Sequence, residues 1–398
     1  MVPVRRIDNK EELTACRKLQ SVAFVNSLDT AELEKNVAAK SETDAPYIGF
    51  FNEEGILTAC MELPEFTMRY EGGWVRMVGL GGVASLPEYR FGGAIRQIVE
   101  TAFRQMRENG AVFSTLYPFS HPYYRQFGYE LCHLLPEYEI PIEALSKFRC
   151  TSKVRMLGPD DPLDGLQTVF DAHFLRCNLA VRREDRHWRE QIGKDPYKER
   201  RYTYLLEDEN GPSAYLVLAA KETGEDERLA HVYEMAFVRP QGLSDLLGFL
   251  YRLSAQYQKT RLSLPEGIPL PALLDESYRV KARHDNQPMA RLIHLQRALE
   301  LKRHFEGAVY TLQVRDNVLA GNDGFFSVRC EGGVVSVERE QEMETADLEI
   351  DVRTLTQLLL GFLSMDEALY KQDVQVNANL ETLRGVFVKR PVFLTDHF

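Results

Sequence analysis

The chain has 398 residues, of which 44% are apolar and 27% charged, and its formal net charge is −11. This length predicts two to four domains, each able to bury its own core. The acidic balance argues against a nucleic-acid partner, because no basic stripe is present to hold phosphates. No apolar run approaches the roughly 18 residues of a membrane span.

Cysteine usage and the first residues narrow the class further. The six cysteines never occur at Cys-x-x-Cys spacing, and no His or Cys residues are paired as metal ligands usually are, so we expect no metal. The chain becomes charged soon after Met1, and no apolar leader follows. We therefore expect a cytoplasmic protein.

The first block alternates helical and extended patterns, which is typical of an α/β or α+β domain. Apolar periodicity predicts, in chain order, a helix at 10–24, strands at 47–51, 56–62 and 74–80, a helix at 95–106, and strands at 111–117 and 136–141. The turn-rich sequence at 158–162 marks the entry to the next block.

The second and third blocks repeat mixed patterns. In the second, helices are predicted at 166–177 and 183–192, strands at 202–206, 214–220 and 232–238, and a helix at 246–253. In the third, strands are predicted at 309–314, 324–330, 334–337 and 348–352, and a helix at 354–363. We place the domains at residues 1–148, 149–285 and 286–398.

The segment with the clearest chemistry lies between the strand at 74–80 and the helix at 95–106. It contains the turn Arg90-Phe91-Gly92-Gly93-Ala94-Ile95-Arg96. The first N–H groups of a helix lack internal partners, and the helix dipole adds partial positive charge there. Two glycines allow a pyrophosphate to approach the backbone closely, and the flanking arginines add charge. The alternative interpretation is a glycine pair that only shapes the turn.

This turn resembles motif A of the GNAT acetyltransferases, whose pattern is Gln/Arg-x-x-Gly-x-Gly/Ala after a strand. Arg90 and the central glycine match, whereas Ile95 stands at the last position instead of Gly or Ala. One branch of the superfamily, the Eis-like (enhanced intracellular survival) acetyltransferases, tolerates a bulky residue there. The segment Tyr123-Tyr124-Arg125-Gln126-Phe127-Gly128-Tyr129 resembles that branch's Tyr-x-x-Phe-Gly-Tyr signature.

The resemblance implies an α+β fold with two GNAT-like mixed-sheet domains and a C-terminal sterol-carrier-like domain. It also implies acetyl-CoA as co-substrate, a hexamer, and acceptors such as aminoglycosides or lysine-bearing proteins. In the second domain, Arg239-Pro240-Gln241-Gly242-Leu243 resembles a decayed motif, and we expect it not to bind CoA.

Residue roles follow from the same resemblance. Tyr124 falls on the general acid, and the α-carboxylate of Phe398 falls on the general base. The cofactor site is assigned to Val83, Ala84, Ser85, Arg90, Phe91, Gly92, Gly93, Ala94, Ile95, Arg96, Phe119 and Ser120. Spacing alone favours a core tyrosine of an aromatic turn for Tyr124, and a chain end such as Phe398 commonly frays.

The sequence therefore predicts an N-acetyltransferase that acts on primary amines of a cationic acceptor. Two other classes stay open. One is a non-catalytic carrier of a hydrophobic ligand that uses the third domain. The other is a CoA-binding regulator without turnover.

Overall fold

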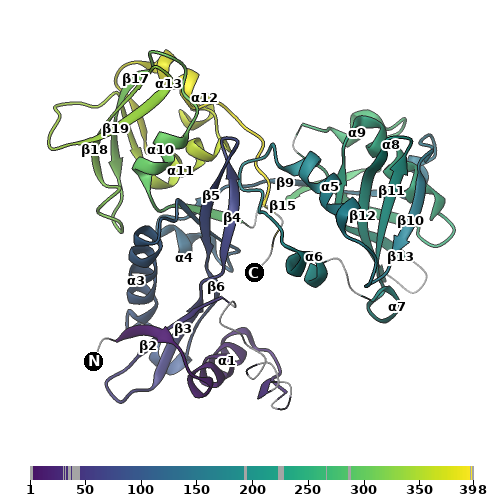
Figure 1. Ribbon diagram of the computed structural model, residues 1–398, viewed down its shortest axis with the longest axis horizontal. Coiled ribbons are helices and arrows are strands. Elements are labelled where there is room, and N and C mark those ends of the chain that lie inside the picture. Colours follow the sequence, from purple (N-terminus) through teal and green to yellow (C-terminus); the bar gives the residue numbers. More distant parts are fainter. Residues whose placement is uncertain are drawn as a thin grey trace. The chain divides into compact units, whose positions relative to one another are not determined.

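The computed structural model describes residues 3–29, 31, 33–34, 37, 45–191, 195–222, 228–265, 267–285, 288–394 and 396 (Figure 1). The chain divides into two compact units. One unit joins residues 1–132 to residues 287–398, and the other consists of residues 133–286.

A four-stranded antiparallel sheet opens the first unit. Its strands β1 (Val4–Ile7), β2 (Tyr47–Phe51), β3 (Leu57–Glu62) and β6 (Gly81–Ser85) lie in the order β1-β2-β3-β6. Helix α1 (Lys10–Phe24) covers one face and helix α3 (Ala94–Glu108) the other. Successive side chains of a strand face opposite sides, so Cys60 packs with α1 whereas Ala59 and Met61 pack with α3.

A second sheet of five strands continues the same unit. Its strands β4 (Glu65–Tyr70), β5 (Gly73–Gly79), β7 (Phe113–Leu116), β16 (Met289–Leu292) and β8 (Glu130–Leu131) lie in the order β4-β5-β7-β16-β8. The pair β5–β7 is parallel, and the other pairs are antiparallel. Strand β16 lies between β7 and β8 although it is more than 150 residues further along the chain. Residues after the second unit therefore complete a sheet whose other strands come from the first 132 residues.

Residues 295–394 add a third sheet with its own helices. Strands β17 (Val309–Arg315), β18 (Gly324–Glu331), β19 (Val334–Glu340), β20 (Leu348–Asp351) and β21 (Val374–Val376) lie in the order β19-β18-β17-β20-β21, with helices α10 (Leu295–Leu301), α11 (Val352–Leu360), α12 (Met365–Ala368) and α13 (Leu380–Val386). This part is held to the β4–β5 hairpin by buried polar contacts. Lys302 pairs with Glu71 at 3.1 Å, and both side chains are 1% exposed.

The second unit is built on one seven-stranded sheet. Strands β10 (Lys153–Leu157), β11 (Arg201–Asp208), β12 (Gly211–Glu222), β13 (Arg228–Phe237), β14 (Lys259–Ser263), β9 (Leu135–Pro141) and β15 (Lys281–Asp285) lie in the order β10-β11-β12-β13-β14-β9-β15. The helices are α5 (Asp164–Phe174), α6 (Asp185–Gln191), α7 (Pro196–Glu199), α8 (Pro240–Arg252) and α9 (Leu270–Leu273). Helix α8 connects β13 to β14, which pair in parallel, as a β-α-β crossover requires.

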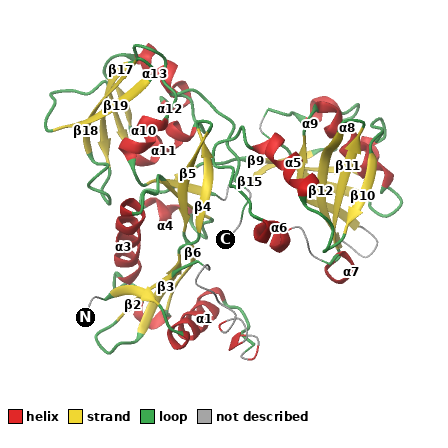
Figure 2. Cartoon of the chain, viewed as in Figure 1, coloured by secondary structure: helices red, strands yellow, loops and turns green. Residues whose placement is uncertain are grey.

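Figure 2 shows that both units mix helices with sheets. The helix predicted at 10–24 and the strand predicted at 47–51 coincide with α1 and β2. The helix predicted at 354–363 ends earlier, because Gly361 adopts φ +76° and caps α11. Short strands such as β1 and β4 were not predicted, since four to six residues carry little periodic signal. The domain boundaries at 148/149 and 285/286 remain predictions.

Candidate active site

A change of strand partner opens the sheet where the site forms. Strands β5 and β6 follow each other along one extended run, but β5 pairs with β7 whereas β6 pairs with β3. The Leu80 N–H donates to the Thr115 carbonyl at 2.9 Å, and the two strands separate after it. Because β6 is an edge strand in the described part of the chain, one row of backbone groups along Val83–Ser85 has no strand partner there.

The turn before α3 exposes the start of that helix. A short 3₁₀ helix, Pro87–Tyr89, leads into Arg90 and Phe91, and Gly93 caps α3 without any side-chain cap. Gly93 has φ +78°, and a Cβ there would meet nothing within 4 Å, so its conformation rather than crowding requires glycine. Residues 87–93 are exposed, and the first N–H groups of α3 are therefore accessible to an anion.

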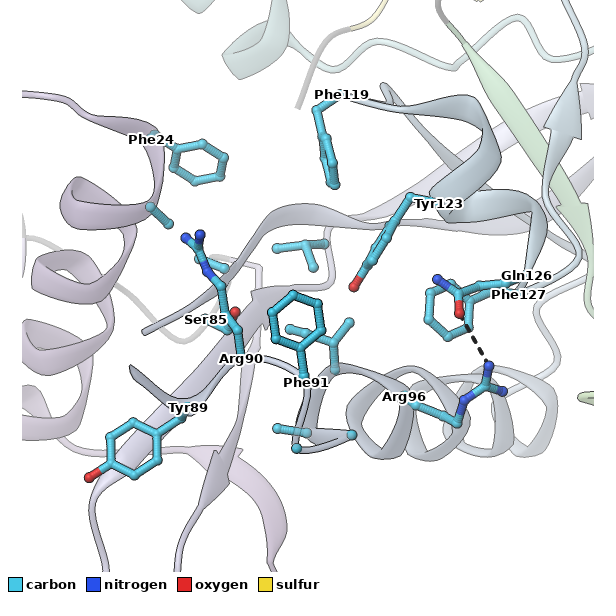
Figure 3. Close-up of a pocket in the computed structure, with 17 residues that line it drawn as sticks. Phe24, Ser85, Tyr89, Arg90, Phe91, Arg96, Phe119, Tyr123, Gln126 and Phe127 are labelled. Carbon is cyan, nitrogen blue, oxygen red and sulfur yellow. Dashed lines mark hydrogen bonds between the residues drawn. The ribbon is translucent and has the colours of Figure 1, made fainter. Parts of the chain in front are cut away.

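A cavity of about 680 Å³ lies at this point (Figure 3). Every residue predicted for the cofactor site except Ser120 lines it. Ser120 instead precedes the short helix α4 (His121–Arg125), where its carbonyl accepts the Tyr124 N–H at 3.4 Å. The cofactor roles of all twelve residues remain predictions.

Sequence reasoning missed part of the cavity wall. The additional lining residues are Ala23, Phe24, Tyr89, Tyr123, Gln126 and Phe127. Tyr123 and Phe127 belong to the aromatic signature, which was a usable signal. Nothing in the local pattern around Phe24 connects the end of α1 with the turn at 90–96. Only the tertiary fold brings them together.

The charge of the cavity is positive among the described lining residues, which include Arg90 and Arg96 but no carboxylate. Two neighbours orient the Arg96 side chain. It donates to Gln126 Oε1 at 3.2 Å, and its guanidinium lies over the Phe127 ring at 5.4 Å from the centroid. Arg90 rises from the turn towards Phe24 (Figure 3). The arrangement suits a ligand with an anionic group at the helix and an apolar arm along the aromatic wall.

Tyr124 lies just behind that wall. It is 5% exposed, and the rings of Phe119, Tyr123 and Tyr129 surround it at centroid distances of 5.6, 5.2 and 6.3 Å. Burial raises the pKa of Tyr124 well above its ordinary value, so the phenol stays protonated at neutral pH. No side chain among the described residues hydrogen-bonds to its hydroxyl group.

The C-terminal segment returns to the end of β7. The Tyr117 hydroxyl donates to the Leu394 carbonyl at 3.3 Å, and Phe393, Leu394 and Asp396 are buried. Phe398, the predicted base, lies outside the described residues. The last described residues are therefore packed beside the strand that leads to the Phe119–Tyr124 segment.

Two negative findings concern the described residues alone. No group of three His, Cys, Asp or Glu side chains is placed to hold a metal ion. No helix in this part of the chain has the length and apolar character needed to cross a bilayer.

Comparison with known families agrees with this geometry. Residues 4–132 and residues 179–292 each match a family model described as an acetyltransferase (GNAT) domain, and residues 295–395 match a sterol carrier protein domain. The two acetyltransferase matches together cover more than half of the chain, which therefore belongs to the GNAT acetyltransferases and is an acyltransferase. The matches confirm the predicted fold class. No curated protein sequence matches the chain significantly.

Solved structures with a similar fold match nearly the whole chain. A probable N-acyltransferase from Enterococcus faecalis V583 matches with a TM-score of 0.85 at 23% identity, over 99% of both chains. A GCN5-related N-acetyltransferase from Anabaena variabilis matches with a TM-score of 0.85 at 19% identity, over 99% of this chain and 100% of that one.

Eis1 from Mycobacterium abscessus matches with a TM-score of 0.79 at 19% identity, again over 99% of this chain and 100% of that one. At such identities the likeness establishes the fold alone. The chain is a GNAT acetyltransferase with the Eis-like three-domain fold.

Proposed function

We propose that the chain transfers the acetyl group of acetyl-CoA to a primary amine of a cationic acceptor, either aminoglycoside-like or lysine-bearing. The observation that carries this proposal is the cavity at the start of α3, where exposed N–H groups and two arginines meet an aromatic wall. A CoA ester has matching chemistry, with a diphosphate at one end of a long arm and a thioester at the other.

Binding uses both ends of the cavity. The diphosphate binds the first-turn N–H groups of α3, with Arg90 and Arg96 adding positive charge. The arm runs along the free edge of β6, and the thioester carbonyl accepts hydrogen bonds from backbone N–H groups at Val83–Ser85. Donors fixed in this way stabilise the negative oxygen that develops as the amine attacks.

The reaction needs one proton acceptor and one proton donor. The amine nitrogen attacks the thioester carbon, a C–N bond forms, and the C–S bond breaks. The amine loses a proton to the Phe398 α-carboxylate, and the departing sulfur gains one from the Tyr124 hydroxyl. A proton then passes through solvent from the Phe398 carboxyl group to the Tyr124 phenolate, which restores both groups and leaves an amide and a free thiol as products.

Tyr124 is a weak acid for this task. With ordinary pKa values near 10 for a phenol and 8.5 for a thiol, the transfer is uphill by about 2 kcal/mol. Burial raises the pKa of Tyr124, but the same apolar surroundings also destabilise a thiolate, so both groups shift in the same direction. Tyr124 therefore donates a hydrogen bond to the sulfur as its charge develops and then passes on the proton.

The role of the chain end is supported by the contact between Tyr117 and Leu394. Phe398 is the fourth residue after Leu394, and four residues of extended chain span at most about 14 Å. The proposed base therefore follows closely on a described segment that is packed beside Tyr117. A carboxylate at this place both attracts an ammonium group and accepts its proton.

The acceptor class rests on charge. The chain carries a net charge of −11, and an acidic surface attracts polycations and raises their encounter rate. Hexameric assembly and a cytoplasmic location are further parts of the proposal. The first rests on the family resemblance alone, and sedimentation of the purified protein tests it.

The decisive experiment measures thiol release from acetyl-CoA by untagged protein with polyamines, aminoglycosides and lysine peptides. We expect amine-dependent release that falls about 100-fold or more in Tyr124→Phe. Deletion of Phe398 has a comparable effect, and so does one glycine added after Phe398, which keeps the ring but moves the carboxylate. Tyr204→Phe, a tyrosine packed on Phe249 in the second unit, is the matched control.

Other outcomes identify the remaining candidates. If acetyl-CoA binds but no amine releases thiol, the chain is a CoA-binding regulator instead of an enzyme acting on these acceptors. If acetyl-CoA does not bind at all, the anion site at α3 is refuted. A hydrophobic-ligand carrier using the sterol carrier protein domain then becomes the leading candidate.

A further inference from the structure

A buried arginine lies behind the turn that follows Tyr124. Arg291 on β16 is 0% exposed and pairs with Ser114 of β7 in the sheet. Its Nη2 donates to both carboxylate oxygens of Asp316, at 2.8 and 2.7 Å. Its Nε and Nη1 have no hydrogen-bond partner among the described residues. Buried N–H groups without partners are costly, so the position of this guanidinium needs an explanation.

The unpartnered side of the guanidinium faces Gly128. A Cβ at position 128 would lie 2.7 Å from Arg291 Cζ and 3.0 Å from Nε. Gly128 also has φ +80°, a conformation that side chains rarely adopt. The flat guanidinium therefore packs directly on the backbone of this turn, and only glycine allows that approach.

The turn transmits this contact to Tyr124. The Tyr124 carbonyl accepts the N–H groups of Phe127 at 3.0 Å and Tyr129 at 3.4 Å. The Tyr129 hydroxyl donates to Ser114 Oγ at 2.6 Å, and Ser114 Oγ donates to the Val78 carbonyl at 2.7 Å. The backbone on both sides of Gly128 is thus fixed to the Tyr124 residue and to the central strands.

The sterol carrier protein domain fixes the arginine in turn. Asp316 follows β17, and besides Arg291 it accepts the N–H groups of Val318 and Leu319, each at 3.0 Å. The Asn322 side-chain amide donates to Oδ2 of Asp316 at 3.3 Å. Asp316 is therefore held by its own loop, and it orients the guanidinium that contacts the Gly128 turn.

We propose that Arg291 is a positioning residue for acyl transfer. It holds the Gly128 turn, and through it the Tyr124 hydroxyl, in the geometry that protonation of the departing sulfur requires. The sterol carrier protein domain thereby acts on the reaction by supporting the acid of the first domain. This inference rests on the proposed role of Tyr124.

The experiment compares steady-state thiol release in Arg291→Lys and Gly128→Ala with that in wild type. Arg291→Lys keeps a charge for Asp316 but loses the flat contact, and Gly128→Ala disturbs the same contact from the other side. We expect kcat to fall about ten-fold in each, because small misplacements of a reacting group are costly, with KM for acetyl-CoA changed less than about two-fold.

A double-mutant cycle distinguishes this role from general destabilisation. If Arg291 acts through Tyr124, Arg291→Lys should lower kcat by less than about three-fold when it is added to Tyr124→Phe. Arg183→Lys is the matched control. Arg183 is also buried and pairs with a carboxylate, that of Glu234, at 2.7 Å, but both residues belong to the second unit. Its kcat should stay within about two-fold of wild type.

The outcomes separate the two hypotheses. If Tyr124→Phe keeps full activity, the acid role is refuted, and the inference falls with it. If Tyr124→Phe loses activity but Arg291→Lys and Gly128→Ala behave like Arg183→Lys, the acid role stands and the positioning role is refuted. An equal loss from Arg291→Lys in both Tyr124 backgrounds also refutes it.

Discussion

The chain contains two versions of the same structural element, a helix that starts after a sheet strand, and they differ at their first turns. In the first domain, Gly93 caps α3 with φ +78°, and residues 87–93 are exposed. In the second, Pro240 begins α8, and the Gly242 N–H donates back to the Arg239 carbonyl at 2.9 Å. The first turn of α3 has no side-chain cap among the described residues, so its N–H groups can bind a ligand. In the first turn of α8, Pro240 has no N–H group and the Gly242 N–H is already bonded.

The two glycines have opposite physical reasons. A Cβ on Gly93 would meet nothing within 4 Å, whereas one on Gly242 would lie 2.9 Å from both Phe237 Cβ and the Ser213 carbonyl oxygen. The Asp245 carboxylate, one turn into α8, already accepts the Thr151 N–H at 3.1 Å. A glycine beside a helix start therefore indicates an anion site only where space and free N–H groups remain.

The largest effect should come from Gly242→Val. The added atoms overlap the Ser213 backbone, so we expect a loss of about 3 kcal/mol in the free energy of unfolding. Urea unfolding followed by circular dichroism measures it. Acetyl-CoA affinity of the folded fraction should stay unchanged. A weakened affinity would mean that α8 takes part in binding, contrary to the comparison.

Gly93→Val should have the reverse profile. The side chain has room, but the left-handed conformation costs a non-glycine residue about 1–2 kcal/mol. The displaced turn no longer presents its N–H groups, so the Kd for acetyl-CoA should rise about 30-fold in calorimetric titration. Unchanged affinity together with a normal fold would refute the anion site.

Charge reversal compares the two turns directly. Arg90→Glu should raise the Kd for acetyl-CoA about ten-fold at low salt and less at high salt, because the site is exposed. Arg239→Glu should leave it unchanged, since Arg239 pairs with Asp208 at 2.7 Å in the second domain. Equal effects from both reversals would indicate long-range charge alone instead of a local site.

Removal of one exposed ring should have a smaller effect. Phe91 is fully exposed at the cavity mouth, with φ +67°. Phe91→Ala should raise the Kd for acetyl-CoA about three-fold. The free energy of unfolding should change by less than about 0.5 kcal/mol, because the ring is exposed and buries little surface in the folded chain. A large stability loss would show that the ring is a packing residue.

The pH profile of kcat should lack the alkaline decline that titration of an exposed catalytic tyrosine would cause. Burial raises the pKa of Tyr124, so its phenol stays protonated as the pH rises through the ordinary value near 10. Below about pH 10, titration of Tyr124 should therefore cause no alkaline decline in kcat. The pH profiles of wild type and Tyr124→Phe should have the same shape in that range. A decline centred near pH 10 that is absent in Tyr124→Phe would contradict the burial of the hydroxyl group.

The motif around residues 83–96 could be predicted because its information is local. A strand, a glycine turn and an amphipathic helix follow one another within a short stretch, and periodicity reveals each of them. Tyr124 was assigned by the resemblance of an aromatic signature, and its catalytic role remains a prediction. Phe24, Arg291 and Asp316 could not be predicted, because each acquires its place through contacts with residues distant in sequence.

The sequence by itself determined the acetyltransferase turn, the main helices and strands, and the order of the domains. Helix capping, apolar periodicity and turn chemistry act between near neighbours and are readable along the chain. Only the tertiary structure decided that β16 completes the five-stranded sheet of the first unit, that Gly242 is a packing glycine, and that Arg291 lies against Gly128. Those facts depend on which distant backbones approach within a few ångströms, and close packing is a property of the folded interior alone.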